Sequence, residues 1–169
     1  EDMTEDRLLE VLEEALAARV IEELPRVVGR YQFTHALIQE TLVEELTLTR
    51  RVRLHARIAQ ALETLYGANA EAHAAELAHH FAEAQTVLGP EKLVRYSQLA
   101  GDRALANYAH EEALSHFERG LAARGIPLSG QGPAKDEEAA VLLFGLGRAQ
   151  AATFDRFQVD AAIDTLRRA

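Results

Sequence analysis

Apolar residues recur every three or four positions along most of the chain, which is the spacing of one face of an α-helix. The spacing predicts helices over residues 4–19, 35–46, 49–66, 72–85, 91–108, 110–123, 135–153 and 159–169. Two short segments, 20–24 and 31–34, have the pattern of strands, and Gly29 between them favours a turn. Because a two-stranded hairpin is not stable alone, we expect it to pack against the helix formed by residues 8–19. The pattern therefore predicts a mostly α fold with one β-hairpin.

Small residues recur at matching places in the last two helix pairs. In each pair, a glycine lies midway along the first helix, and a small–x3–large–x2–small pattern marks the second. The residues are Gly101, Ala113, Phe117 and Gly120 in one pair, and Gly147, Ala162, Leu166 and Ala169 in the other. Small residues let two helices approach closely while the large one fills the groove between them. The pattern predicts helical hairpins stacked as a solenoid, with residues 125–133 as a linker between them.

Composition and charge narrow the chemistry. The chain has 169 residues, including 31 Ala and 24 Leu, and no cysteine. The lack of cysteine excludes disulfides, Cys-ligated metals and a thiol nucleophile. The net charge of −9 disfavours a broad nucleic-acid-binding surface. No segment has the length of a membrane span, and the acidic first residues differ from a signal peptide, so we expect a cytoplasmic location.

The chain stops within a strong helical pattern, so we expect it to be a piece of a longer protein. A solenoid cut inside a repeat lacks its polar cap. We therefore expect exposed apolar surface at Leu142, Leu143, Ile163 and Leu166, and possible self-association.

The spacing of Gly101, Ala113, Phe117 and Gly120 resembles the tetratricopeptide repeat, whose small and aromatic positions these residues match without an offset. In the second pair Ala162 lies three residues late, which implies a longer turn at residues 154–157. The resemblance implies an array of tetratricopeptide-like helical hairpins.

Three separated blocks resemble, in the same order, one stretch of bacterial STAND-type regulators. The blocks are residues 31–40 (YQFTHALIQE), 51–59 (RVRLHARIA) and 74–81 (AAELAHHF). These regulators are signal-transduction ATPases with nucleotide-binding, winged-helix and tetratricopeptide-like parts, often fused to adenylate/guanylate cyclase or LuxR-type DNA-binding domains. The resemblance implies a winged-helix remnant over 1–47, linking helices over 48–89 and repeats over 90–169.

His35 is the candidate cofactor-binding residue. Residues 34–38 resemble the Met-His-Asp-Leu-Leu motif of related winged-helix domains, in which the histidine contacts the β-phosphate of ADP. His35 and the pair Leu37-Ile38 match this motif, whereas Thr34 and Ala36 depart from it. The position between a strand and a helix also suits a phosphate, since helix N-termini favour anions. Alternatively, His35 caps the helix or packs on the core.

A stripe of arginines is the candidate partner-binding surface. Arg50, Arg53 and Arg57 lie at i, i+3 and i+7 on one helical face. Such a stripe suits an acidic partner, phosphates or the nucleotide-binding domain. Alternatively, it is a solvated face whose arginines pair with Glu44, Glu45 and Glu63.

His73, Glu76 and His80 have the same spacing and could hold a metal, but one helix cannot easily surround a tetrahedral ion. We therefore expect no metal site. No catalytic constellation is recognisable, so we expect no enzyme activity from this chain and no cofactor in it, although ATP or ADP would bind the parent protein.

The expected function is regulatory. The chain would relay binding of a protein, a peptide or a small-molecule inducer on the repeats to a nucleotide switch in an upstream domain. One alternative is a free-standing repeat adaptor that binds a partner peptide. Another is a winged-helix DNA-binding module, which only the stripe from Arg50 to Arg57 supports.

Overall fold

The computed structural model describes residues 4–25, 28–130, 132–153 and 156–169. The fold is mostly α-helical with one antiparallel hairpin and a helical array, as predicted. The chain forms two compact units, Glu1–Arg51 and Val52–Ala169. Among the described residues, no helix is both long enough and apolar enough to cross a membrane.

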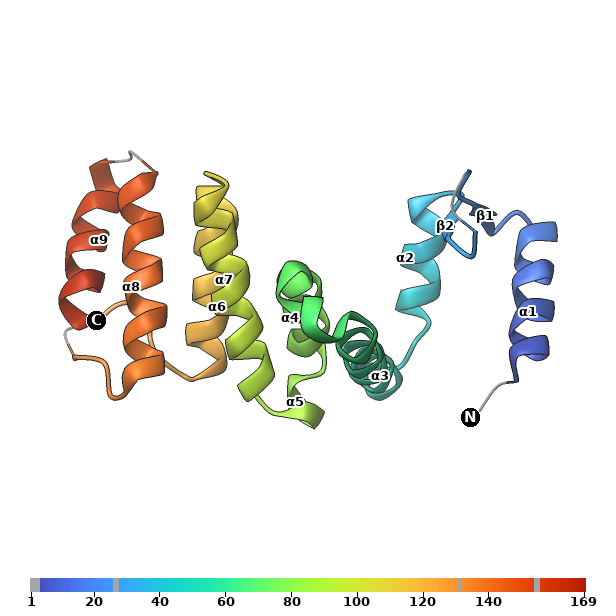
Figure 1. Cartoon of the computed structure of the whole chain (residues 1–169), viewed down its shortest axis with the longest axis horizontal. Helices are drawn as coiled ribbons and strands as arrows, with labels where there is room; N and C mark the ends of the chain where they lie inside the picture. Colours follow the sequence, from blue (N-terminus) through green and yellow to red (C-terminus); the bar gives the residue numbers. More distant parts are fainter. Residues whose placement is uncertain (1–3, 26–27, 131, 154–155) are drawn as a thin grey trace. The chain divides into compact units, whose positions relative to one another are not determined.

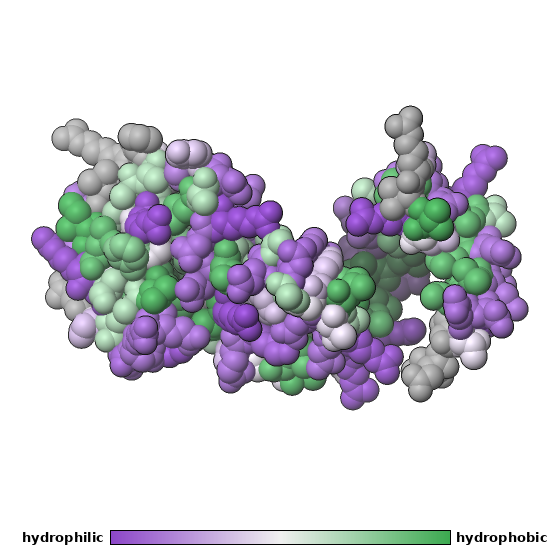
Figure 2. Space-filling view, in the orientation of Figure 1, coloured by the Kyte–Doolittle hydropathy of each residue, from purple (hydrophilic) through white to green (hydrophobic). Residues whose placement is uncertain are grey.

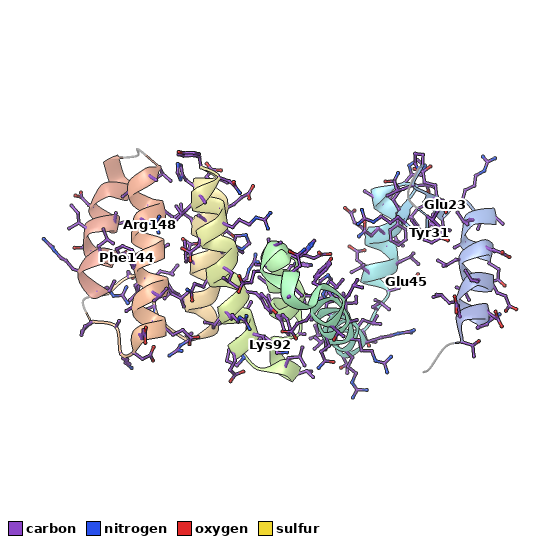
Figure 3. The ribbon with its side chains drawn as sticks, in the orientation of Figure 1. Glu23, Tyr31, Glu45, Lys92, Phe144 and Arg148 are labelled. Atoms are coloured by element: carbon purple, nitrogen blue, oxygen red, sulfur yellow. The ribbon has the colours of Figure 1, made fainter. Side chains whose placement is uncertain are left out.

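The described residues of the first unit form two helices, the hairpin and the first turn of α3 (Leu48–Tyr66) (Figure 1). Its elements are α1 (Glu5–Ala17), β1 (Ile21–Glu23), β2 (Tyr31–Phe33) and α2 (Ala36–Glu44). The hairpin register places Glu23 opposite Tyr31, both labelled in Figure 3. The Thr34 hydroxyl donates to the Arg19 carbonyl at 2.7 Å, which ties the end of β2 to the segment after α1. The predicted turn includes Arg26 and Val27, which lie outside the described residues.

The first unit has little core of its own. Its helix α1 contacts β1, the arrangement expected for a hairpin leaning on a helix. None of the residues described in this unit is buried, however, and Leu8 and Leu37 are 48% and 71% exposed. Figure 2 shows hydrophobic residues on the surface of this unit. Packing within the unit alone therefore leaves much of its apolar surface in water.

The second unit is a series of packed helices. Its elements are the greater part of α3 (Leu48–Tyr66), η1 (Gly67–His73), α4 (Ala74–Glu83), α5 (Gln85–Leu88), α6 (Glu91–Ala106), α7 (His110–Ala123), α8 (Glu137–Ala152) and α9 (Arg156–Arg168). Contacts join α4 to α6, α6 to α7, α7 to α8 and α8 to α9 (Figure 1). The helix predicted over 72–85 is divided, because Ala84 adopts φ −102° and ψ 7° between α4 and α5.

Among the described residues, the core of the second unit consists of two clusters. Phe81, Tyr96 and their neighbours join α4 to α6. The other cluster joins α6, α7 and α8 through apolar residues that include Leu142 and Leu143. The predicted exposure of these two leucines is wrong, because both pack within this cluster. The prediction is confirmed for Ile163 and Leu166, which are 43% and 38% exposed.

Phe117 shows why the array needs glycines. Its ring is fully buried on α7, and a Cβ added to Gly101 on α6 would lie 2.7 Å from its Cζ. A Cβ added to Gly145 on α8 would come closer still to the same ring. In the next pair, a Cβ on Gly147 would lie 2.6 Å from Leu166 Cγ. The predicted close approach at the glycines singled out in both pairs is confirmed. Gly145 adds a contact that the spacing did not reveal.

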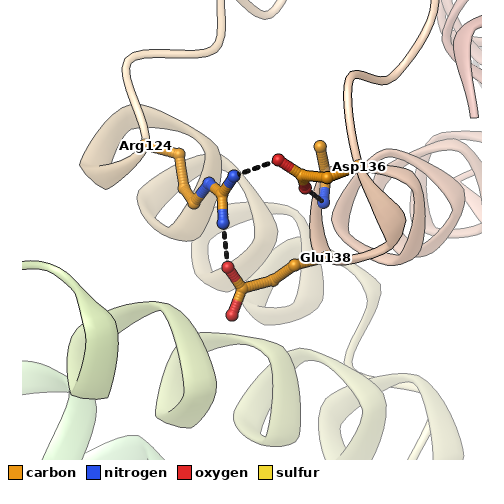
Figure 4. Close-up of polar contacts among 4 residues, drawn as sticks. Arg124, Asp136 and Glu138 are labelled. Atoms are coloured by element: carbon orange, nitrogen blue, oxygen red, sulfur yellow. Dashed lines mark hydrogen bonds and ion pairs between the residues drawn. The ribbon is translucent and has the colours of Figure 1, made fainter.

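Side chains at both ends hold the linker between α7 and α8. Arg124 forms ion pairs with Asp136 and Glu138 (Figure 4). Asp136 also caps α8, because its Oδ1 accepts from the Ala139 N–H at 2.9 Å. This backbone hydrogen bond, with help from Arg124, lowers the pKa of Asp136. The buried Arg168 guanidinium donates to three linker carbonyls, those of Pro127, Leu128 and Gly132.

The longer turn predicted at residues 154–157 falls partly outside the described part of the chain. Phe154 and Asp155 are not described, and α9 begins at Arg156.

Candidate functional site

His35 occupies the position that the sequence predicts, between a strand and a helix. β2 ends at Phe33, and His35 is the N-cap residue of α2 with extended backbone angles of φ −142° and ψ 135°. Its side chain is exposed and makes no capping hydrogen bond. The imidazole therefore neither caps α2 nor packs in a core, and the sensing of ADP by His35 stays a prediction.

Arg50, Arg53 and Arg57 all lie on α3, and all three are exposed. Arg50 belongs to the first unit, whereas Arg53 and Arg57 belong to the second. Within the described ranges, none of the three forms an ion pair with a carboxylate. These side chains are thus available to a partner, and their role in binding stays a prediction.

Glu63, a proposed partner of the α3 arginines, bonds to side chains of α6 instead. Its carboxylate accepts from Lys92 Nζ and, at 2.8 Å, from the Tyr96 hydroxyl. Figure 3 labels Lys92 at this junction. Burial by itself would raise the pKa of Glu63, but the hydrogen bonds from Lys92 and Tyr96 outweigh burial and lower it. Burial and the bond to Glu63 raise the pKa of Tyr96 to about 12. This network fastens α3 to α6.

The candidate set His73, Glu76 and His80 is not brought together. His73 stacks on Tyr66, with ring centroids 3.7 Å apart, and its Nδ1 lies 3.8 Å from Glu76 Oε2. Glu76 accepts from the Tyr66 hydroxyl at 2.8 Å. His80 instead meets His55 of α3, so the three residues serve two separate clusters.

Three histidines of α3 and α4 form a cluster that the sequence did not predict. His55 Nδ1 and His80 Nδ1 are 3.1 Å apart, and His79 lies beside both. The ring centroid of His55 is 5.6 Å from that of His79 and 5.1 Å from that of His80. Burial lowers the pKa of His80, and His55 and His79 lower it further against the opposing effect of nearby carboxylates. These effects favour the neutral form of His80.

A groove of about 290 Å³ lies between α4, α6 and α7. Alanines and polar side chains together line it. The lining residues are Ala72, His73, Ala75, Glu76, Ala100, Arg103, Ala104, Asn107, Ala109, Glu112 and His116. His116 Nδ1 is buried and has no hydrogen-bond partner in the described part of the chain. Burial, aided by Arg119, lowers the pKa of His116 and favours its neutral form.

Comparisons of the chain with protein-family models, with curated proteins and with solved structures gave no match. What the groove and the histidine cluster can bind therefore follows from their own geometry and chemistry.

Proposed function

We propose that the chain is the regulatory, protein-interaction part of a larger bacterial signal-transduction ATPase. It binds a partner peptide in the groove between α4, α6 and α7 and relays that binding to a nucleotide switch. The resemblance of residues 31–40, 51–59 and 74–81 to STAND-type regulators supports the ATPase class. The binding role is carried by one observation: His116 lines the groove, and its buried Nδ1 has no hydrogen-bond partner among the described residues.

The groove suits an extended peptide. Its alanines leave room for a backbone to approach, and the polar side chains between them can pair with peptide N–H and C=O groups. Arg103 and Glu112 bring opposite charges, so the lining favours a polar peptide of mixed charge over a polyanion. A buried nitrogen without a partner is costly. Because His116 Nδ1 is closed off from solvent, the ring has to turn toward the groove when a peptide binds, and the hydrogen bond formed then removes that cost.

The exposed apolar surface of the first unit supports a contact with another protein domain. It buries none of its described residues and exposes large apolar side chains that include Leu8, Leu9 and Leu42. Exposed apolar surface of this kind marks interaction sites. In the proposed switch, this surface packs against the nucleotide-binding domain, and His35 faces the phosphates of ADP.

The peptide role is tested by selecting binders from a displayed random-peptide library and measuring their affinity for variants of the chain. We expect the affinity of the selected peptides to fall about tenfold in His116→Ala, since one hydrogen bond to a buried group is lost. Glu118→Ala, an exposed change on the same helix, is the matched control and keeps the affinity. Failure to enrich any peptide, or equal binding by both variants, would overturn the role of the groove.

The ATPase role is tested by reading the gene on the 5′ side of the codon for Glu1. We expect an in-frame strand followed by Gly–x4–Gly–Lys–Ser/Thr, the motif that cradles nucleotide phosphates. The protein containing that motif should retain ADP, and His35→Ala should release it, whereas His110→Ala should not. A start codon close to Glu1 without the motif would leave a peptide-binding adaptor.

DNA binding is a second candidate, favoured by the exposed arginines of α3 that lack ion pairs within the described ranges. It predicts a DNA complex that weakens steeply with salt and is lost in Arg53→Glu. An unshifted DNA probe at low salt would exclude this alternative.

A further inference from the structure

We propose that His55, His79 and His80 bind a divalent transition-metal ion, and that this ion is Zn²⁺. Each histidine offers one ring nitrogen, and the three nitrogens lie within 4.8 Å of one another. The three side chains come from two helices, α3 and α4. This arrangement meets the objection that one helix cannot surround an ion.

The distances fit a zinc ion. With Zn–N bonds of 2.0–2.1 Å and tetrahedral angles, ligand nitrogens stand about 3.3 Å apart. The Nδ1 atoms of His55 and His80 are already 3.1 Å apart. A pair at the outer limit of 4.8 Å would close by about 1.5 Å, which rotation of the exposed His79 side chain and smaller turns of the half-buried His55 and His80 can supply.

Small residues on the two helices allow this approach. Ala59 on α3 and Ala78 on α4 are fully buried in the same core cluster. With the helices held there, His55 lies against the pair His79-His80. His79 is exposed, so water can reach the ion and occupy a fourth position. Three protein ligands and one water are a common zinc coordination.

The donor set selects the class of metal. The ligands are three imidazoles, and the chain contains no cysteine. Ca²⁺ and Mg²⁺ prefer oxygen ligands, whereas imidazole suits Zn²⁺ and its neighbours in the transition series. The nearby carboxylate of Glu76 is already bonded to Tyr66. The site should therefore take Zn²⁺ and reject Mg²⁺.

The bound ion would join α3 directly to α4. A ligand that binds only the folded state stabilises it in proportion to the logarithm of its concentration over Kd. We therefore expect Zn²⁺ to raise the melting temperature of the chain, and a chelator to reverse the rise.

The experiment is calorimetric titration of the tag-free full chain with Zn²⁺, repeated for single alanine variants of the three histidines. We expect one Zn²⁺ per chain and at least a tenfold loss of affinity in each variant, since even indirect partners of a metal ligand contribute that much. His110→Ala removes a histidine outside the cluster and serves as the matched control. His79→Ala changes an exposed side chain, so its loss of binding cannot be ascribed to unfolding.

A second measurement follows the imidazole ¹⁵N resonances during the titration, because metal binding shifts the coordinating nitrogen directly. Three shifted histidines, with no shift on adding Mg²⁺, support the site. Zinc binding unaffected by His55→Ala would mean that His79 and His80 bind the ion without α3, and would overturn the proposal. Equal losses in His110→Ala, or no binding by the native chain, would do the same.

Discussion

Adding one methyl group at Gly145 should destabilise the second unit, although alanine is the better helix former. Gly145 lies within α8, where its Cα faces the ring of Phe117. A Cβ built there would overlap the ring, and Gly101 bounds the ring from α6. Because Phe117 is fully buried between these two helices, its ring cannot move away without displacing one of them.

Two opposing effects set the size of the change. Replacing glycine by alanine inside a helix contributes about 0.5–1 kcal/mol of stability. Forcing an extra carbon into a packed core costs about 1–3 kcal/mol, and more where the neighbours are rigid. The overlap at Gly145 involves a ring fixed on both sides, so the upper end applies. We expect Gly145→Ala to lower the free energy of unfolding by about 2 kcal/mol.

The assay is urea denaturation of the full chain followed by circular dichroism, with Phe117→Leu and the double variant alongside. Phe117→Leu alone should also destabilise, since it leaves a cavity. In the double variant the leucine leaves room for the added methyl group. The loss of stability in the double variant should therefore be at least 1 kcal/mol smaller than the sum of the losses in the two single variants. Additive losses, or a Gly145→Ala variant as stable as the native chain, would refute the reasoning.

Three further predictions concern other contacts of the second unit. Between pH 10 and pH 12 the chain should lose about 2 kcal/mol of stability through Tyr96, because its raised pKa keeps the folded state protonated while the unfolded state releases the proton near pH 10. Thermal melts should show a smaller loss over this range in Tyr96→Phe, and an equal loss would contradict the prediction. Arg168→Ala should lower the free energy of unfolding by about 2 kcal/mol, because it removes the hydrogen bonds to the linker carbonyls. Limited proteolysis of this variant should cleave within 127–132, and an unchanged cleavage pattern would contradict the prediction. Gly89→Ala should cost about 1–2 kcal/mol in denaturant melts, because Gly89 has φ +78°, while Gly132→Ala, with open space at its Cβ, should be neutral.

The helices were largely predictable because apolar spacing is a local property of the sequence. The helix at His110–Ala123 is found at its predicted bounds, and the strands at Ile21–Glu23 and Tyr31–Phe33 fall inside the predicted segments. The division of the helix predicted over 72–85 was not predictable, since no proline or glycine marks Ala84. Burial of Leu142 was also missed. It depends on how α7 covers α8, which is a property of two helices and not of one.

The histidine cluster was missed for the same reason, because it depends on a contact between two helices. Spacing along one helix groups His80 with His73, because residues seven apart share a face. In the structure His73 turns to Tyr66, and His80 meets a residue 25 positions earlier on α3. The signal that could have found this pair lies in the alanines. Ala59 and Ala78 predict where two helices approach closely. His55 lies four residues before Ala59, and His79 directly follows Ala78. The small residues locate the contact between the two helices, and the polar residues that flank them in the sequence then predict the histidine cluster.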